Sequence, residues 1–279
     1  MSVAIEQPVA QVVTSARART VVQPVTFPRA VRSEWIKMRS LRSTSFTIAA
    51  AVGVMVLMGW VFSWASNKYW STMRPDEIAS FNAIDTSLLG YTLAQAAITV
   101  LGVLLVTGEY STGMIRATLA AVPRRLPVLW AKAGVFGVTT FAVTLVAGVG
   151  AFAGGQAFLG SHSTELVSSD AGVALVAVAG YLTLIGVLAV ATGFILRNTA
   201  GAIALLLGLL MVLPVIGLLL PASWQDHVVP YLPSQAGASM VSVYSAPGGL
   251  SSLESLAVLL AWVTVAVVGA AVVLGRRDA

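Results

Sequence analysis

The stretch GEYSTGMIRATLAAVPRRLPVLWAK, residues 108–132, separates two long apolar runs and interrupts them with charge. Its basic residues are Arg116, Arg124, Arg125 and Lys132. Pro123 and Pro127 stand on either side of the paired arginines. The part before them is amphipathic, and its two sides are Met114, Ile115 and Leu119 against Thr112, Arg116 and Thr118. In a chain this hydrophobic, we expect the whole stretch to lie outside the lipid.

Composition defines the broad class of protein. The 279 residues are 57% hydrophobic and only 10% charged, whereas about 25% of the residues of a soluble domain are charged. The chain is therefore expected to be a membrane protein. It has no cysteine, which excludes disulfides and thiolate metal sites.

Six apolar runs are long enough to cross a bilayer, which requires about 20 residues. They cover residues 46–65, 88–107, 133–159, 171–196, 202–220 and 255–274. The sequence thus predicts an all-α polytopic membrane protein with six transmembrane helices. Residues 1–26 are expected to be a flexible cytoplasmic tail, and residues 27–279 a single transmembrane domain.

The distribution of lysine and arginine predicts the orientation. Residues 1–45 before the first span, segments 108–132 and 197–201, and residues 275–279 hold 14 of the 16 basic residues, whereas segments 66–87, 160–170 and 221–254 hold 2. The positive-inside rule then places both termini and segment 108–132 in the cytoplasm. We expect a multi-pass protein of the plasma membrane.

Residues 27–42 have the periodicity of a basic amphipathic helix. Its apolar face is predicted to carry Phe27, Val31, Trp35, Met38 and Leu41, and its other side Arg29, Arg32 and Arg39. Such a helix suits the membrane surface. The alternative is that these arginines only flank the first span.

The outside segment 221–254 lacks basic residues and is too interrupted by proline and glycine to span. One interpretation is a re-entrant hairpin covered by protein, in which Val228, Val229, Tyr231 and Leu232 find apolar surroundings. The other is an ordinary surface loop with a short helix.

No Asp, Glu, Lys, Arg or His falls inside the six predicted spans, which argues against a proton relay. Gln95 is the clearest polar residue at depth, and we expect it to make an interhelical hydrogen bond. The chain has no G-x-x-x-x-G-K-[ST] loop. His162 and Glu165 lack a third metal ligand, so we expect no metal site. No catalytic grouping of side chains is apparent either, and we expect no enzyme activity, no directly bound cofactor and no nucleic acid partner.

Glu109 stands where the second span ends. It is expected to pair with a nearby arginine. The pair either only satisfies an interfacial carboxylate or holds the loop rigid, so that movement of the loop displaces the second and third spans. Arg124 and Arg125 are expected to anchor the returning chain at the lipid headgroups.

Four stretches together resemble the permease subunits of ABC-2-type transporters, including small six-span permeases of actinobacteria. They are RSEWIKMRSLRST (32–44), TGEYSTGMIRATLAAVPRR (107–125), RNTAGAIA (197–204) and YLPSQAG (231–237). The resemblance covers roughly residues 28–279 and leaves the N-terminal extension unexplained. Residues 107–125 resemble the family's first cytoplasmic loop and are the most specific part.

The resemblance implies a permease dimer, formed by a second copy or a related permease, with separate nucleotide-binding ATPase subunits that hold ATP and Mg. It also implies a coupling helix at about residues 112–121 that docks into the ATPase through Thr112, Met114, Ile115, Arg116 and Leu119. Such permeases mostly export drugs, antibiotics or lipid-like compounds. Two alternatives stay open: a secondary transporter, and a non-transporting membrane component that recruits an ATPase.

Overall fold

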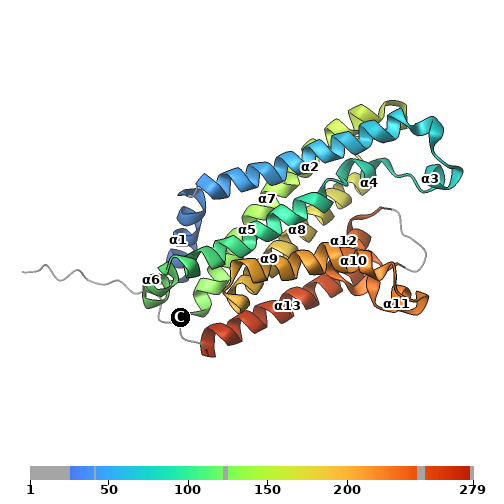
Figure 1. Ribbon diagram of the computed structural model, residues 1–279. Coiled ribbons are helices and arrows are strands. Elements are labelled where there is room, and N and C mark those ends of the chain that lie inside the picture. The colour runs from blue at the N-terminus through green and yellow to red at the C-terminus, as the bar shows by residue number, and fades with distance from the viewer. Residues whose placement is uncertain (1–25, 41, 122–124, 244–248, 277–279) are drawn as a thin grey trace, which may run out of the picture.

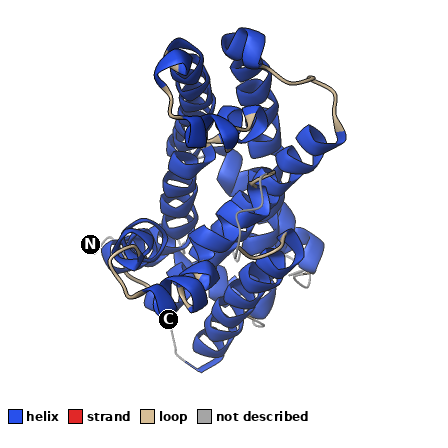
Figure 2. Ribbon diagram, turned by 90° about the vertical axis from the view of Figure 1, so that its right-hand side faces the viewer, coloured by secondary structure: helices blue, strands red, loops and turns tan. Residues whose placement is uncertain are grey.

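The protein is all-helical in the part of the chain that the computed structural model describes, and Figure 2 shows helices joined by short loops. The described residues are 26–40, 42–121, 125–243 and 249–276, without the side chains of Arg42 and Ala121. The predicted tail of residues 1–26 lies almost wholly outside them.

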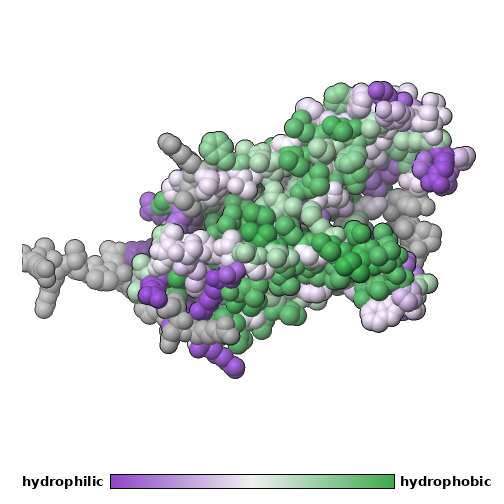
Figure 3. Space-filling model, viewed as in Figure 1, coloured by the Kyte–Doolittle hydropathy of each residue, from purple (hydrophilic) through white to green (hydrophobic). Residues whose placement is uncertain are grey.

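Six described helical segments are long and apolar enough to cross a membrane, as predicted. They are Ser43–Lys68, Ala83–Ser111, Leu126–His162, Ser169–Leu196, Thr199–Gly217 and Ser252–Arg276. Figure 3 shows hydrophobic surface along the middle of the bundle and hydrophilic patches at its two ends. The chain is therefore a multi-pass membrane protein by the length and composition of its helices.

Helix α8 (Ser169–Leu196) is the central helix of the bundle. It packs against α5 (Tyr91–Ser111), α7 (Leu126–Leu159) and α13 (Ser252–Arg276), while α2 (Arg42–Lys68) packs on α7 and α5 (Figure 1). The side chains of α8 itself are apolar on all sides of the helix, which is the pattern of a helix buried by its neighbours.

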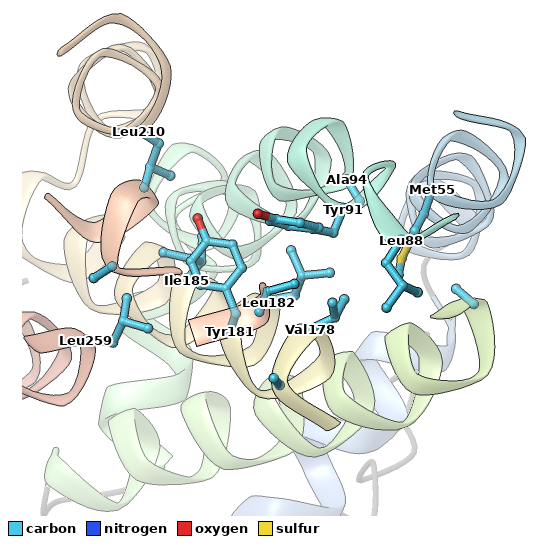
Figure 4. Packing of buried hydrophobic residues seen from close by; sticks show 14 of the residues in the cluster. Met55, Leu88, Tyr91, Ala94, Val178, Tyr181, Leu182, Ile185, Leu210 and Leu259 are labelled. Carbon is cyan, nitrogen blue, oxygen red and sulfur yellow. The ribbon is translucent and has the colours of Figure 1, made fainter. Parts of the chain in front are cut away.

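Two hydrophobic clusters fill the bundle. The first contains Met55, Leu88, Tyr91 and Tyr181, and the rings of Tyr91 and Tyr181 meet edge to face with centroids 5.7 Å apart (Figure 4). The second joins Met38 of α1 (Phe27–Ser40), Ile115 of α6 (Met114–Ala121), Leu129 of α7, Phe194 of α8 and Leu274 of α13. It lies at the end of the bundle that carries α1, α6 and the end of α13 (Figure 1).

The second span has a helix that the sequence did not predict. Within the expected loop 66–87 lie a 3-10 turn (Trp70–Thr72), α3 (Pro75–Ala79) and α4 (Ala83–Leu88). Helix α4 is buried against α7 and α2. Gly59 and Gly90 allow this packing. A Cβ atom on Gly59 would collide with the backbone carbonyl of Ser87, and one on Gly90 would collide with that of Met55.

The fifth span is interrupted. It consists of α9 (Thr199–Leu207), a π-helical turn (Gly208–Val212) and α10 (Leu213–Gly217), so it ends three residues before the predicted boundary. Pro214 has no N–H to donate, which accounts for a local change in helical hydrogen bonding.

The segment between the fifth and sixth spans folds into α11 (Ala222–His227), a 3-10 turn (Val229–Tyr231) and α12 (Pro233–Val241). Helix α12 packs against α13 and α8, and Gly237 lies directly on the ring of Tyr181. Leu232 is buried and Val229 half-buried, whereas Val228 and Tyr231 are exposed on the protein surface. Entry of this segment into lipid stays a prediction.

Candidate functional site

Four charged side chains from three helices meet at the end of the bundle that carries α1 and α6. Glu34 and Lys37 come from α1, Glu109 from α5 and Lys132 from α7. We call them the charge cluster. Lys132 is only 1% exposed, and Glu34 and Glu109 are each 5% exposed.

The two lysines bridge the two carboxylates. Lys132 Nζ donates to Glu34 Oε2 at 2.6 Å, to Glu109 Oε1 at 2.8 Å and to the Leu105 carbonyl at 3.4 Å. Lys37 Nζ donates to Glu34 Oε1 at 2.8 Å, to Glu109 Oε1 at 3.0 Å and to Thr118 Oγ1 of α6 at 3.4 Å. The cluster therefore joins α1, α5, α6 and α7.

The cluster contains two positive and two negative groups, so the four ionised side chains sum to zero. Buried charges are tolerated when they are paired and hydrogen-bonded in this way. For Lys37, burial lowers the pKa of the ammonium. The hydrogen bond and charge of Glu34, with those of Glu109, outweigh that burial and raise the pKa above its ordinary value.

Local sequence explains how each group reaches the cluster. Ala30, Glu34 and Met38 are spaced four apart and form the buried face of α1, with Lys37 one turn beyond Glu34. Helix α7 begins at Leu126, with Pro127 in its first turn. Lys132 is therefore the seventh residue of the helix, about 10 Å along its axis at 1.5 Å per residue.

Two sequence predictions are wrong here. Segment 108–132 is not all interhelical, because residues 108–111 belong to α5 and residues 126–132 belong to α7. Both helices run past the predicted spans, so Glu109 and Lys132 lie near helix ends and outside residues 88–107 and 133–159. The ion-pair partners of Glu109 are Lys37 and Lys132 rather than an arginine.

The predicted coupling helix begins two residues later than expected. Thr112 ends α5, and Gly113 turns the chain with a φ of 72°, a conformation that favours glycine. In α6, Ile115 is 3% exposed and packs in the second hydrophobic cluster with the half-buried Leu119. Thr112, Met114 and Arg116 are exposed. Ile115 and Leu119 thus face the protein, and the other three predicted docking residues face outward.

Helix α1 buries Met38 of its predicted apolar face and exposes other members of that face. Phe27 is 51% exposed and Trp35 42% exposed, with Arg39 lying over the Trp35 ring at 6.0 Å. Arg32 is exposed, and Leu41 lies outside the described residues. The face of α1 that carries Glu34 is buried, because Glu34 pairs there with Lys132 of α7. A place in the headgroups stays a prediction for the exposed Trp35, Arg32 and Arg39.

Neighbouring loops reach the same end of the bundle. Arg125 Nη1 donates to the Leu274 carbonyl of α13 at 3.1 Å, whereas Arg124 lies outside the described residues. At the α8–α9 turn, Arg197 lies 5.1 Å from the ring of Tyr110, and Thr199 Oγ1 donates to Thr107 Oγ1 at 2.9 Å. Anchoring of Arg125 at headgroups stays a prediction.

Two other predicted residues are also placed. Gln95 makes the expected interhelical hydrogen bond, because its Oε1 accepts from Tyr181 Oη of α8. His162 stacks on Trp70 with centroids 3.7 Å apart, and Glu165 is exposed. The described residues contain no group of three metal-ligating side chains.

Sequence reasoning missed three members of the charge cluster. The amphipathic pattern of residues 27–42 gives no role to Glu34 or Lys37, and the predicted third span begins one residue after Lys132. The available signal was the spacing of Glu34 from Ala30 and Met38, since a carboxylate on a buried helical face needs a basic partner.

Searches of protein-family models and of curated proteins give no match to the chain. The resemblance of residues 107–125 and of the three shorter stretches therefore stays a prediction, and function is inferred from the geometry of this end of the bundle.

Proposed function

We propose that the chain is the membrane permease subunit of an ATP-driven exporter, with ATP hydrolysed by a separate subunit. The observation that supports this most is the construction of α6. A helix of eight residues presents Met114 and Arg116 outward, while Ile115 and Leu119 hold it in the second hydrophobic cluster.

The charge cluster supplies the mechanical connection in this proposal. Lys37 contacts Thr118 of α6 and, through Glu109, the end of α5. Lys132 joins the same carboxylate to α7. A partner that displaces α6 would therefore move α1, α5 and α7 together, since separating them would leave buried charges unpaired.

The test uses the exposed side of α6 and leaves its buried side intact. Arg116→Glu is co-expressed with any ATPase subunit encoded beside this chain, and co-purification in mild detergent is measured. We expect at least a tenfold loss of associated ATPase, because the substitution reverses charge on the docking surface.

Arg74→Glu is the matched control, because Arg74 is exposed and directly precedes α3, which lies at the other end of the bundle from α6 (Figure 1). The control is expected to retain the ATPase. Equal association of wild type, Arg116→Glu and Arg74→Glu would refute docking through α6.

A secondary transporter is the second candidate, and one observation favours it. The presence of Glu109 and Lys132 inside helical spans removes the argument that the membrane segments lack charge. Against it, both groups lie near helix ends and are ion-paired, whereas secondary transporters bind their coupling ions near the midplane. Transport by reconstituted chain without ATPase or ATP, driven by a proton gradient, would select this candidate over the exporter.

A further inference from the structure

Two pockets adjoin at the corner between α1 and α2. One, of about 330 Å³, is an open groove along a face of α1, and the other, of about 440 Å³, lies between the corner and the end of α5. Lys37 and Ser40 line both of them. We call the two pockets together the corner groove.

The charged side chains that line the corner groove are mostly basic. Arg29, Arg32 and Lys37 line the part along α1, where the described residues of the lining include no acidic side chain. Lys132 and Glu109 line the other part. Both lysines bind Glu109 through Oε1, and its Oε2 is buried. Four basic groups against one carboxylate that is already paired favour an anionic ligand.

The corner groove also contains hydrogen-bond donors that the protein does not use. Arg32 is exposed and enters no ion pair within the described part of the chain. The hydroxyls of Ser43 and Thr44 make no hydrogen bond to any described residue. The other three hydroxyls of the lining donate to backbone carbonyls at 2.9–3.0 Å; they belong to Ser40, Thr47 and Thr112.

Lys37 is the lysine that an entering anion can contact. Its side chain is 25% exposed, whereas that of Lys132 is 1% exposed. The bond from Lys37 Nζ to Thr118 Oγ1 is 3.4 Å long, longer than its two ion pairs at 2.8 and 3.0 Å. An anionic oxygen can therefore replace Thr118 and leave both ion pairs intact, because a charged acceptor binds an ammonium more strongly than a hydroxyl does.

The apolar side of the corner groove belongs to the spanning helices. Leu101, Leu104 and Leu105 of α5 form a wall, and Leu104 is 41% exposed. The first spanning segment, Ser43–Lys68, begins in the same lining. The groove thus has basic groups at the end of the bundle and an apolar wall along the spans, which matches the order of head and tail in a membrane lipid.

We propose that the corner groove binds an anionic phospholipid of the leaflet at the α1–α6 end. The phosphate lies where the two pockets adjoin and accepts from Lys37 in place of Thr118, with Arg32 as a second cation. An acyl chain lies along the leucine wall of α5. The binding does not depend on the proposed function.

The test counts the lipids bound to the full chain in detergent by native mass spectrometry. Phosphatidylglycerol and phosphatidylcholine with the same acyl chains are added at equal concentration, so that only the head differs. We expect one phosphatidylglycerol per chain, bound at least tenfold more tightly than phosphatidylcholine. Soluble glycerol phosphate, which has no tail, is expected not to bind at the same concentration.

Two exposed arginines of α1 give a matched pair of variants for the head. Arg32 lines the corner groove, whereas Arg39 lines neither pocket. Arg32→Gln is expected to weaken phosphatidylglycerol binding about fivefold, since a basic residue near an anionic lipid contributes about that factor. Arg39→Gln removes the same charge from the same helix and is expected to leave the binding unchanged.

Two glycines give a matched pair for the tail. A Cβ atom added at Gly108, which lines the groove, meets nothing within 4 Å, and the same is true of Gly134 in α7, which does not line it. Gly108→Leu is expected to fill the space beside the leucine wall and to weaken phosphatidylglycerol binding at least tenfold. Gly134→Leu is expected to bind as wild type does. All four variants are checked by thermal unfolding.

Equal binding of the two lipids, equal losses in Arg32→Gln and Arg39→Gln, or full binding by Gly108→Leu would each overturn the proposal. Glycerol phosphate bound as tightly as phosphatidylglycerol would overturn it too, because the ligand would then be a soluble phosphate ester. No ATPase is present, so the result is separate from the test of α6.

Discussion

At the end of the bundle that carries α1 and α6, helices α1, α5 and α7 meet at buried ion pairs, whereas at the opposite end α2, α4 and α7 meet at neutral groups. There Gln156 Nε2 donates to the Ala83 carbonyl and to Ser87 Oγ, both at 3.0 Å. Its Oε1 accepts from the Thr164 N–H at 2.8 Å, and Ser63 Oγ lies 3.3 Å from Ser87 Oγ. We call this the neutral network.

The two ends differ in what they leave unsatisfied. In the neutral network, both amide donors and the amide oxygen of Gln156 are used. Gly155 lies so close to Ser87 that a Cβ atom would come within 2.6 Å of its Oγ. In the charge cluster, Glu109 Oε2 lacks a partner among the described residues and a pocket opens beside it.

This difference indicates separate tasks. Tight packing and complete hydrogen bonding make the neutral network a rigid joint. The charge cluster holds its helices by buried ion pairs that are costly to separate. We therefore expect the α1–α6 end, which carries the proposed docking helix, to move as one unit.

The largest expected effect comes from removing the cation at the centre of the charge cluster. Lys132→Met leaves two buried carboxylates with one lysine, and loss of one partner of a buried ion pair costs about 3–5 kcal/mol. Thermal unfolding in detergent is expected to show the largest loss of stability of the substitutions considered.

A second substitution separates charge from packing at the same place. Adding Glu109→Gln to Lys132→Met restores neutrality and should recover part of the lost stability. Lys68→Met, at an exposed lysine near the other end, is expected to stay within about 0.5 kcal/mol of wild type. A double variant less stable than Lys132→Met would contradict the charge argument.

A smaller effect is expected at the neutral network. Gln156→Leu removes three hydrogen bonds without leaving a buried charge, at a cost of about 1–3 kcal/mol. Gln225→Leu is the matched control, because the side chain of this glutamine also donates to two carbonyls but lies in the short helix α11 outside the bundle core. If Gln156→Leu destabilised more than Lys132→Met, the comparison of the two ends would be reversed.

The smallest expected effect is a loss of folding stability at alkaline pH, and it arises from the charge cluster alone. The raised pKa of Lys37 means that the folded state holds this proton more tightly than the unfolded chain. Its contribution is complete below the ordinary pKa of 10.5 and is lost as pH rises through the raised value.

The measurement compares wild type with Lys37→Met by thermal unfolding at pH 9 and above pH 10.5. The advantage of wild type is expected to shrink over this interval. Gln156→Leu should show a constant difference, because the neutral network contains no group that titrates there. A constant advantage for Lys37 would contradict the pairing seen with Glu34 and Glu109.

The sequence by itself determined the class and much of the fold. Six apolar runs of about 20 residues require spanning helices, and all six are found. The amphipathic segment after the second span and the family resemblance predicted a short helix at about residues 112–121, and α6 begins at Met114. These features are local, because hydropathy and helical periodicity are properties of a short window.

Only the tertiary structure decided which charges are buried and how they pair. Lys132 binds Glu34 across 98 residues and Glu109 across 23. No window of hydropathy contains such partners, so a lysine that belongs to a helix was assigned to a loop. The stability of a buried charge depends on the groups around it rather than on its neighbours in sequence. For that reason packing, and not composition, decided which side of α1 turns inward and which groups pair with Lys132.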